Sequence, residues 1–144
     1  MAVELYERGF DPWAELQVYQ QTRLEPGHFG ATASFVGTMR DFNEGAAVER
    51  LFLEHYPGMT ERELERIVAA EVEGHGLLDA LVVHRVGAIE PGEPIVLVAT
   101  WSAHRAAAFD ACRAIMEALK SRAPFWKNEA TGAGARWVER NTPG

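Results

Sequence analysis

The two lysines of this chain lie seven residues apart in one short stretch that runs from residue 120 to residue 129. Lysine and arginine total fourteen, and only Lys120 and Lys127 are lysines. Arginine stays protonated and is a poor nucleophile, whereas a buried or crowded lysine amine can lose its proton and act as a base, an acid or a nucleophile. Arginine-rich codon usage would also leave few lysines, so composition alone favours neither interpretation.

The residues around the lysines favour a reactive site. Pro124, Phe125 and Trp126 lie between them. A proline with two large aromatic residues more often lines a pocket than lies in a solvent-exposed loop. Glu129 follows Lys127 by two residues and either orients or neutralises one lysine, or simply covers the surface.

Composition describes an ordinary globular protein of 144 residues, which we expect to form a single domain over residues 1–144. No stretch reaches the roughly 20 apolar residues of a membrane helix, and the N-terminus lacks the order of a signal peptide, so we expect a cytoplasmic protein. The net charge of −7 argues against non-specific nucleic-acid binding but leaves room for an anionic small ligand. A single cysteine, Cys112, excludes an internal disulfide and a cysteine-only metal site.

Three helices are predicted from capping residues and apolar spacing. Asp11 and Pro12 begin the first. Thr60, with Glu63 three residues later, forms a capping box for the second, which ends at the glycines of 74–76. Ser102 caps the third, which Pro124 ends. Its buried stripe includes Cys112, which we interpret as a core residue rather than a catalytic thiol.

Strands are predicted between these helices, which makes the fold α+β. The segment at 48–56 is apolar enough near 51–53 for burial on both faces, and the segment at 95–101 suits a central strand. Residues 40–45 and 130–135 are polar or glycine-rich and are predicted loops. His84 lies inside a strand, where a lone histidine is more often structural than a ligand. The predicted strands are 31–39, 48–56, 81–89 with a break at Gly87, 95–101, and a short strand or tail at 136–140 before a frayed end at 141–144.

A possible anion site begins the last helix, where His104 and Arg105 add positive charge to free backbone N–H groups. A solvated cap explains the same residues equally simply. Arg40, at a strand-to-loop junction, adds a bidentate grip suited to phosphate. Lys120 lies about sixteen residues further along the helix, roughly 24 Å away, so one protomer cannot easily bring it to His104. A symmetric dimer with antiparallel helices would do so.

Three blocks of sequence resemble the large, catalytic subunit of molybdopterin synthase. They are Leu53 to Thr60, Ser102 to Phe109 and Lys120 to Glu129, and they occur in family order. The resemblance runs from about residue 30 to about residue 139 and is looser before that. It implies an α/β hammerhead fold with an additional antiparallel sheet, and it implies an enzyme. Neither the residues nor the resemblance indicates a metal or a cofactor.

The resemblance also implies a reaction and a partner. The family converts cyclic pyranopterin monophosphate (precursor Z) into molybdopterin, in molybdenum cofactor biosynthesis. The sulfur arrives as a thiocarboxylate on the Gly-Gly tail of a small ubiquitin-like subunit, which threads into the large subunit. A homodimer of large subunits with one small subunit at each end forms a heterotetramer. Sulfur carried on a partner explains why no catalytic cysteine is needed.

Site residues carried over from the family are expectations. Lys120 and Lys127 match its essential lysines, with Lys120 at the tail terminus. Arg140 directly follows the Trp-Val-Glu block, and it is open whether it fills the role of a further family arginine that reaches the neighbouring site. The expected substrate-binding residues are Thr38, Met39, Arg40, His104, Arg105, Asn128 and Glu129, and the expected tail-channel residues are Phe35 and Met116.

Two other classes of function remain open from the residues alone. One is a Schiff-base lysine enzyme that acts on an anionic carbonyl compound. The other is a non-catalytic module that binds a ubiquitin-like tail.

Overall fold

A four-stranded sheet forms the centre of this computed structural model, which describes residues 1–43, 46–131 and 134–138. Neighbouring strands are antiparallel, except that the two at one edge run parallel. The two interior strands are covered on both faces, which explains why they are apolar over nearly their whole length. In order across the sheet, the strands are β1 (Ala2–Tyr6), β5 (Asp79–Arg85), β7 (Pro94–Ser102) and β2 (Ala31–Thr38).

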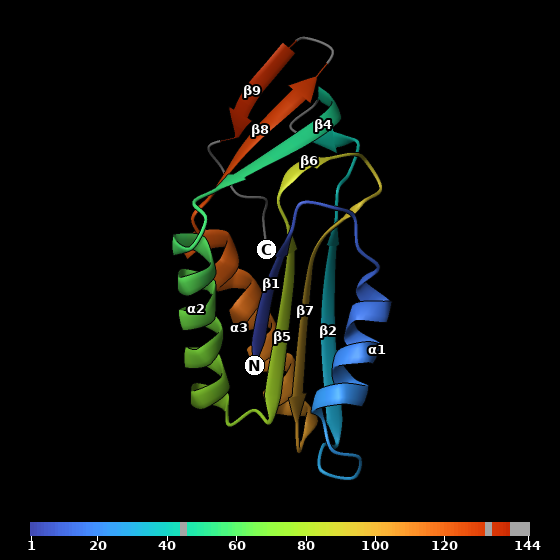
Figure 1. Cartoon of the computed structure of the whole chain (residues 1–144), viewed down its shortest axis with the longest axis vertical. Coiled ribbons are helices and arrows are strands. Elements are labelled where there is room, and N and C mark those ends of the chain that lie inside the picture. Colours follow the sequence, from blue (N-terminus) through green and yellow to red (C-terminus); the bar gives the residue numbers. More distant parts are fainter. Residues whose placement is uncertain (44–45, 132–133, 139–144) are drawn as a thin grey trace.

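Helices cover both faces of this main sheet (Figure 1). On one face lies α1 (Pro12–Arg23), whose Tyr19 packs on Trp101 of β7 with ring centroids 5.4 Å apart. The opposite face is covered by α2 (Met59–His75) and α3 (Arg105–Arg122). Each face has its own buried apolar cluster, because successive strand residues point to opposite sides.

A second sheet lies beyond the end of the main sheet at which β2 and β5 finish (Figure 1). A small cluster of Met39, Leu51, Leu53 and Ile89 fills the space where the chain passes between the two sheets. The predicted α+β hammerhead-like fold with an additional antiparallel sheet is therefore confirmed. The strands of the second sheet are β3 (Phe42–Asn43), β4 (Ala46–His55), β8 (Phe125–Thr131), β9 (Gly134–Val138) and β6 (Gly87–Ile89), the last paired with β4.

Most predicted elements are present, with two kinds of error. Two strands were not predicted. The edge strand β1 is short and half-exposed and has no long apolar run. No strand was predicted for residues 125–129 either, where β8 mixes polar and apolar residues. Parts of both predicted loops are strands, since Phe42–Asn43 pairs with β4 and β8 continues to Thr131. The predicted break at Gly87 is confirmed, and its φ of +81° is a conformation that favours glycine. The predicted features at 139–144 lie outside the described residues.

Two of the three predicted helix caps are wrong. Asp11 does cap α1, accepting backbone N–H bonds from Trp13 and Ala14. Gly58, not Thr60, precedes α2, and the Glu61 carboxylate accepts the Gly58 N–H. The Thr60 hydroxyl instead accepts the Tyr56 N–H and donates to the Pro124 carbonyl, so it ties α2 to the segment after α3.

The third cap is displaced by two residues. Ser102 ends β7, and its hydroxyl donates to the carbonyl of His104, which is the residue that precedes α3. The predicted two-sided burial near residue 52 is also wrong. Leu51 and Leu53 are buried, but the side chain of Phe52 is 42% exposed on the other face of β4.

Candidate active site

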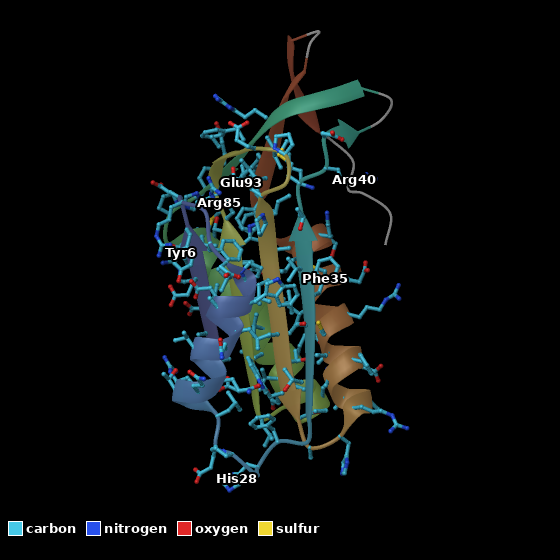
Figure 2. The ribbon with its side chains drawn as sticks, turned by 90° about the vertical axis from the view of Figure 1, so that its right-hand side faces the viewer. Tyr6, His28, Phe35, Arg40, Arg85 and Glu93 are labelled. Atoms are coloured by element: carbon cyan, nitrogen blue, oxygen red, sulfur yellow. The ribbon has the colours of Figure 1, made fainter. Side chains whose placement is uncertain are left out.

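The end of β2 presents Arg40 beside the second sheet (Figure 2). Met39, just before it, is buried and held on both sides by the turn before β7: its N–H donates to the Glu93 carbonyl at 2.9 Å, and its carbonyl accepts the Gly92 N–H at 2.8 Å. Arg40 is exposed immediately beyond this double anchor, and Thr38 is exposed before it. The backbone at Arg40 is therefore fixed while its side chain stays accessible.

An ion pair between buried Arg85 and partly exposed Glu93 stabilises the turn that anchors Met39. Arg85, at the end of β5, donates to the Glu93 carboxylate at 2.9 Å and to the Ala88 carbonyl at 2.7 Å. Glu93 also accepts the Glu90 N–H, and these bonds together lower the pKa of its carboxyl group, the backbone bond contributing most. Figure 2 shows Arg85 and Glu93 at the same end of the main sheet as Arg40.

The two lysines come from different elements that meet at the same end of the main sheet. Lys120 lies in the last turn of α3, and Lys127 lies in β8, opposite Leu53 of β4. Because directly opposed residues share a face, Lys127 is on the face of β8 that holds Phe125 and is opposite buried Leu53. Both lysine side chains are partly buried.

Both lysines influence the protonation of one buried residue, His84. It is buried at the end of β5, and its pKa falls to about 4, chiefly because burial disfavours the charged ring and further because of the positive charges of Lys127 and Lys120. The bond between its Nδ1 and the Arg85 carbonyl acts in the opposite direction. The geometry agrees, because Lys127 follows by two residues the Phe125 ring that stacks on His84, and Lys120 lies in the last turn of the helix that leads into this strand.

The expected tail-channel residues lie on the side of the main sheet that faces α3. Phe35 is 42% exposed on β2, and Met116 packs partly against the core cluster on that side. The Phe35 ring lies over Gly37, where an added Cβ would stand 3.3 Å from the ring and 2.9 Å from Val96. A glycine at this position therefore leaves room for the ring.

His104 and Arg105 lie at the opposite end of α3 from Lys120. Both side chains are exposed, and no side chain caps the helix there. Fifteen helical steps separate Arg105 from Lys120, or roughly 22 Å along the axis. The structure of one chain thus brings Arg40, Lys120 and Lys127 to one end, and it does not bring His104 or Arg105 to them.

Asn128 and Glu129 lie in β8 between two partner strands. Their backbones pair with Phe52 and Leu51 of β4, and with Trp137 and Arg136 of β9. They therefore belong to the same strand as Lys127. Arg140 lies outside the described residues.

Neither a metal cluster nor a reactive thiol is found in the described part of the chain. No group of three or more His, Cys, Asp or Glu side chains there could hold a metal ion. Burial raises the pKa of the Cys112 thiol to about 11, so it is neutral near pH 7, as expected of a core residue. Among the described helices, none combines the length and apolar character needed to cross a bilayer.

Comparison with known proteins decides the family. The family model described as MoaE protein matches residues 11–122. The chain belongs to the MoaE family. It is 50% identical over 139 residues to the molybdopterin synthase catalytic subunit of Pseudomonas aeruginosa. This match covers 96% of this chain and 91% of that protein. The prediction of an enzyme of the molybdopterin synthase catalytic-subunit type, acting in molybdenum cofactor biosynthesis, is confirmed.

Solved structures of this family share the fold. The molybdopterin biosynthesis MoaE protein from Burkholderia ambifaria superposes with a TM-score of 0.81 at 43% identity, covering 99% of this chain and 93% of that one. A protein complex of subunits 1 and 2 of the molybdopterin-converting factor from Helicobacter pylori matches in fold, with a TM-score of 0.79 at 19% identity. That match covers 97% of this chain and 92% of that chain.

Sequence reasoning interpreted His84 correctly as a structural histidine, but it missed Arg85, Glu93 and the way these three residues organise this end of the MoaE-family fold. His84, Arg85 and Glu93 carry no motif, and their partners are distant in sequence or depend on the turn after β6. One signal was present: two adjacent polar residues, His84 and Arg85, interrupt an otherwise apolar strand. A buried polar pair at a strand end requires partners, and here those partners lead to the site.

Proposed function

We propose that this chain catalyses sulfur transfer from the C-terminal thiocarboxylate of a small ubiquitin-like subunit to precursor Z, which yields molybdopterin. The observation that carries the proposal is that the chain's two lysines, at the end of α3 and the start of β8, flank a segment whose Phe125 stacks on buried His84 at the end of the main sheet. Family membership gives that arrangement its chemistry. The expectation that the protein is cytoplasmic and acts as one domain remains a prediction.

Lys120 is the residue that we place at the tail terminus. Once the thiocarboxylate sulfur has attacked a carbon of precursor Z, a thioester joins the tail to the pterin. The Lys120 amine can attack the carbonyl carbon of this thioester, so that the C–S bond to the tail breaks, the sulfur stays on the pterin and the tail forms an amide with the lysine, or it can move protons as water cleaves the same bond. Lys127 lies in the adjoining strand and assists as a second cation beside the anionic thiocarboxylate. Phe35 and Met116 lie on the α3 side of the sheet and suit the wall of a narrow apolar channel. A Gly-Gly tail fits such a channel because glycine has no side chain.

Arg40 is the residue that we place on the phosphate of precursor Z. Its backbone is fixed by Met39, and its exposed guanidinium suits a bidentate phosphate contact. Thr38 lies two residues before Arg40, and Asn128 and Glu129 directly follow Lys127. These three are proposed as further binding residues.

His104 and Arg105 enter the same site only from a second copy of the chain. They lie too far from Lys120 within one chain, and a two-fold dimer with antiparallel α3 helices would place one copy's Arg105 beside the other copy's Lys120. The proposed assembly is a homodimer with a small subunit bound at each end. The solved complex of the two converting-factor subunits supports the small-subunit part of this proposal.

A single-turnover assay tests the function. The purified chain is mixed with precursor Z and a thiocarboxylated small subunit, and dithiolene formation is followed. Formation of molybdopterin is the expected result. Tight binding of the small subunit without any turnover would instead favour a non-catalytic tail-binding module. Borohydride trapping of substrate on a lysine in the absence of any small subunit would favour a Schiff-base enzyme.

A further inference from the structure

His84 is a buried ring at the junction of the two sheets that the proposed chemistry does not use. It is the sixth residue of β5, and its side chain is almost fully enclosed. Its Nδ1 lies 2.8 Å from the Arg85 carbonyl oxygen. A carbonyl only accepts hydrogen bonds, so Nδ1 carries the proton and Nε2 keeps its lone pair.

The ring of His84 stacks on the segment that joins the two lysines. Its centroid is 4.2 Å from that of Phe125, with an angle of 20° between the planes. Phe125 begins β8 two residues before Lys127, and its N–H donates to the Ala123 carbonyl at 2.9 Å. Phe125 also packs against the core cluster beneath α3. The stack therefore fixes the start of β8 against the end of β5.

Charged groups reach His84 from each element that carries the site. Lys120 approaches from α3 and Lys127 from β8, and both lower the pKa of the ring. On its own strand, Arg85 directs its guanidinium to Glu93 and Ala88 and offers His84 only its carbonyl. A neutral ring fills this place without adding a third positive charge beside two lysines.

We propose that His84 is a positioning residue that sets the placement of Lys120 and Lys127 through its stack on Phe125. The role of these lysines in turnover rests on the proposed function, but their placement by His84 does not. Because the stack joins β5 to the connection between α3 and β8, losing it should let the backbone segments that carry the two lysines shift relative to each other.

The composition of the chain allows a direct test of placement. Because Lys120 and Lys127 are the only lysines, a protein labelled with ¹³C-lysine gives two side-chain Cε signals without overlap. These signals would be recorded for wild type, His84→Leu, His84→Phe and the control His28→Leu. His28 is exposed at the opposite end of the main sheet (Figure 2).

His84→Leu fills the space without an aromatic stack, so both lysine signals should shift. His84→Phe keeps a ring on Phe125 and should restore the wild-type signals, and His28→Leu should leave them unchanged. In the single-turnover assay, His84→Leu should lose on the order of tenfold or more in rate, while binding of the small subunit is kept. His84→Phe should recover most of that loss.

Wild-type lysine signals in folded His84→Leu would overturn the proposal, as would a His84→Phe variant as defective as His84→Leu. If His84→Leu does not fold, Phe125→Leu removes the same stack from the other side and is judged by the same two signals. The NMR measurement needs neither substrate nor partner. A wild-type protein that shows no sulfur transfer would therefore sink the proposed function and leave the test of His84 intact.

Discussion

The two ends of α3 are built in different ways. At the Lys120 end, three elements converge on buried groups, namely the His84–Phe125 stack and the Arg85–Glu93 ion pair. At the Arg105 end, the side chains of His104 and Arg105 are exposed, and the approach to the helix depends on backbone contacts. One end is thus preorganised within the chain, whereas the other end offers cations without a surrounding pocket. The difference fits a site in which the exposed end completes the buried end of a second copy.

The largest expected effect is the recovery of turnover when two inactive variants are combined, which tests whether each site uses both ends of α3 from two different copies. Lys120→Ala and Arg105→Ala should each be almost inactive alone. When equal amounts of the two are unfolded and refolded together, about half of the dimers should be mixed, and each mixed dimer should hold one intact site out of two. Turnover should therefore return to about a quarter of wild type. If every site used residues of one chain, the mixture would stay inactive, and refolding each variant alone supplies the control.

Gly30→Ala should disturb the exposed end selectively. An added Cβ would lie 2.3 Å from the Ala103 carbonyl oxygen, just before His104, and a backbone atom cannot move aside cheaply. We expect a loss of about 1–3 kcal/mol in the free energy of unfolding, measured by urea denaturation. Gly74→Ala is the control, since nothing lies within 4 Å of its Cβ, and a gain of about 0.5–1 kcal/mol is expected in α2. An unchanged free energy of unfolding in Gly30→Ala would mean that residue 30 is not packed tightly against the Ala103 carbonyl before α3.

Glu93→Gln should disturb the buried end through Arg40. It leaves the Arg85 guanidinium, which is 8% exposed, without its carboxylate, and it weakens the turn that holds Met39. We expect a loss of about 1–2 kcal/mol of stability, moderated by the partial exposure of Glu93, and weaker binding of precursor Z measured by calorimetry. Glu90→Gln removes an exposed pair with Arg50 and should change stability by less than about 0.5 kcal/mol. Equal effects of the two variants would argue against this anchor.

Cys112→Ser should have the smallest effect on turnover. The thiol is buried against α3 and the sheet, with Sγ 3.8 Å from the Val98 carbonyl, and it is remote from any proposed step. We expect the single-turnover rate to stay within about twofold of wild type, with a stability loss of about 1 kcal/mol from burying a hydroxyl. Abolished turnover in the folded variant would contradict sulfur delivery by the partner alone.

Local sequence patterns predicted much of the fold, whereas the lysine site stays a prediction. The Asp11-Pro12 cap, the apolar run of β7 and the break at Gly87 depend on neighbours in sequence, and the structure contains all three. The strand that carries Lys127 was not predicted, because it forms through pairing with β4, which lies far away in the chain. The stacking partner of His84, Phe125, is likewise far away in the chain, and the bonds of Glu93 to Arg85 and Glu90 depend on the shape of one turn, so no spacing rule reveals them.

The central claim is that Lys120 carries the sulfur-transfer step. The most direct measurement compares wild type with Lys120→Ala in the single-turnover assay, with binding of the small subunit measured in parallel. We expect molybdopterin formation to fall by on the order of 10²-fold or more while the small subunit still binds. Turnover at the wild-type rate in Lys120→Ala would contradict the account and move the chemistry to Lys127 or elsewhere.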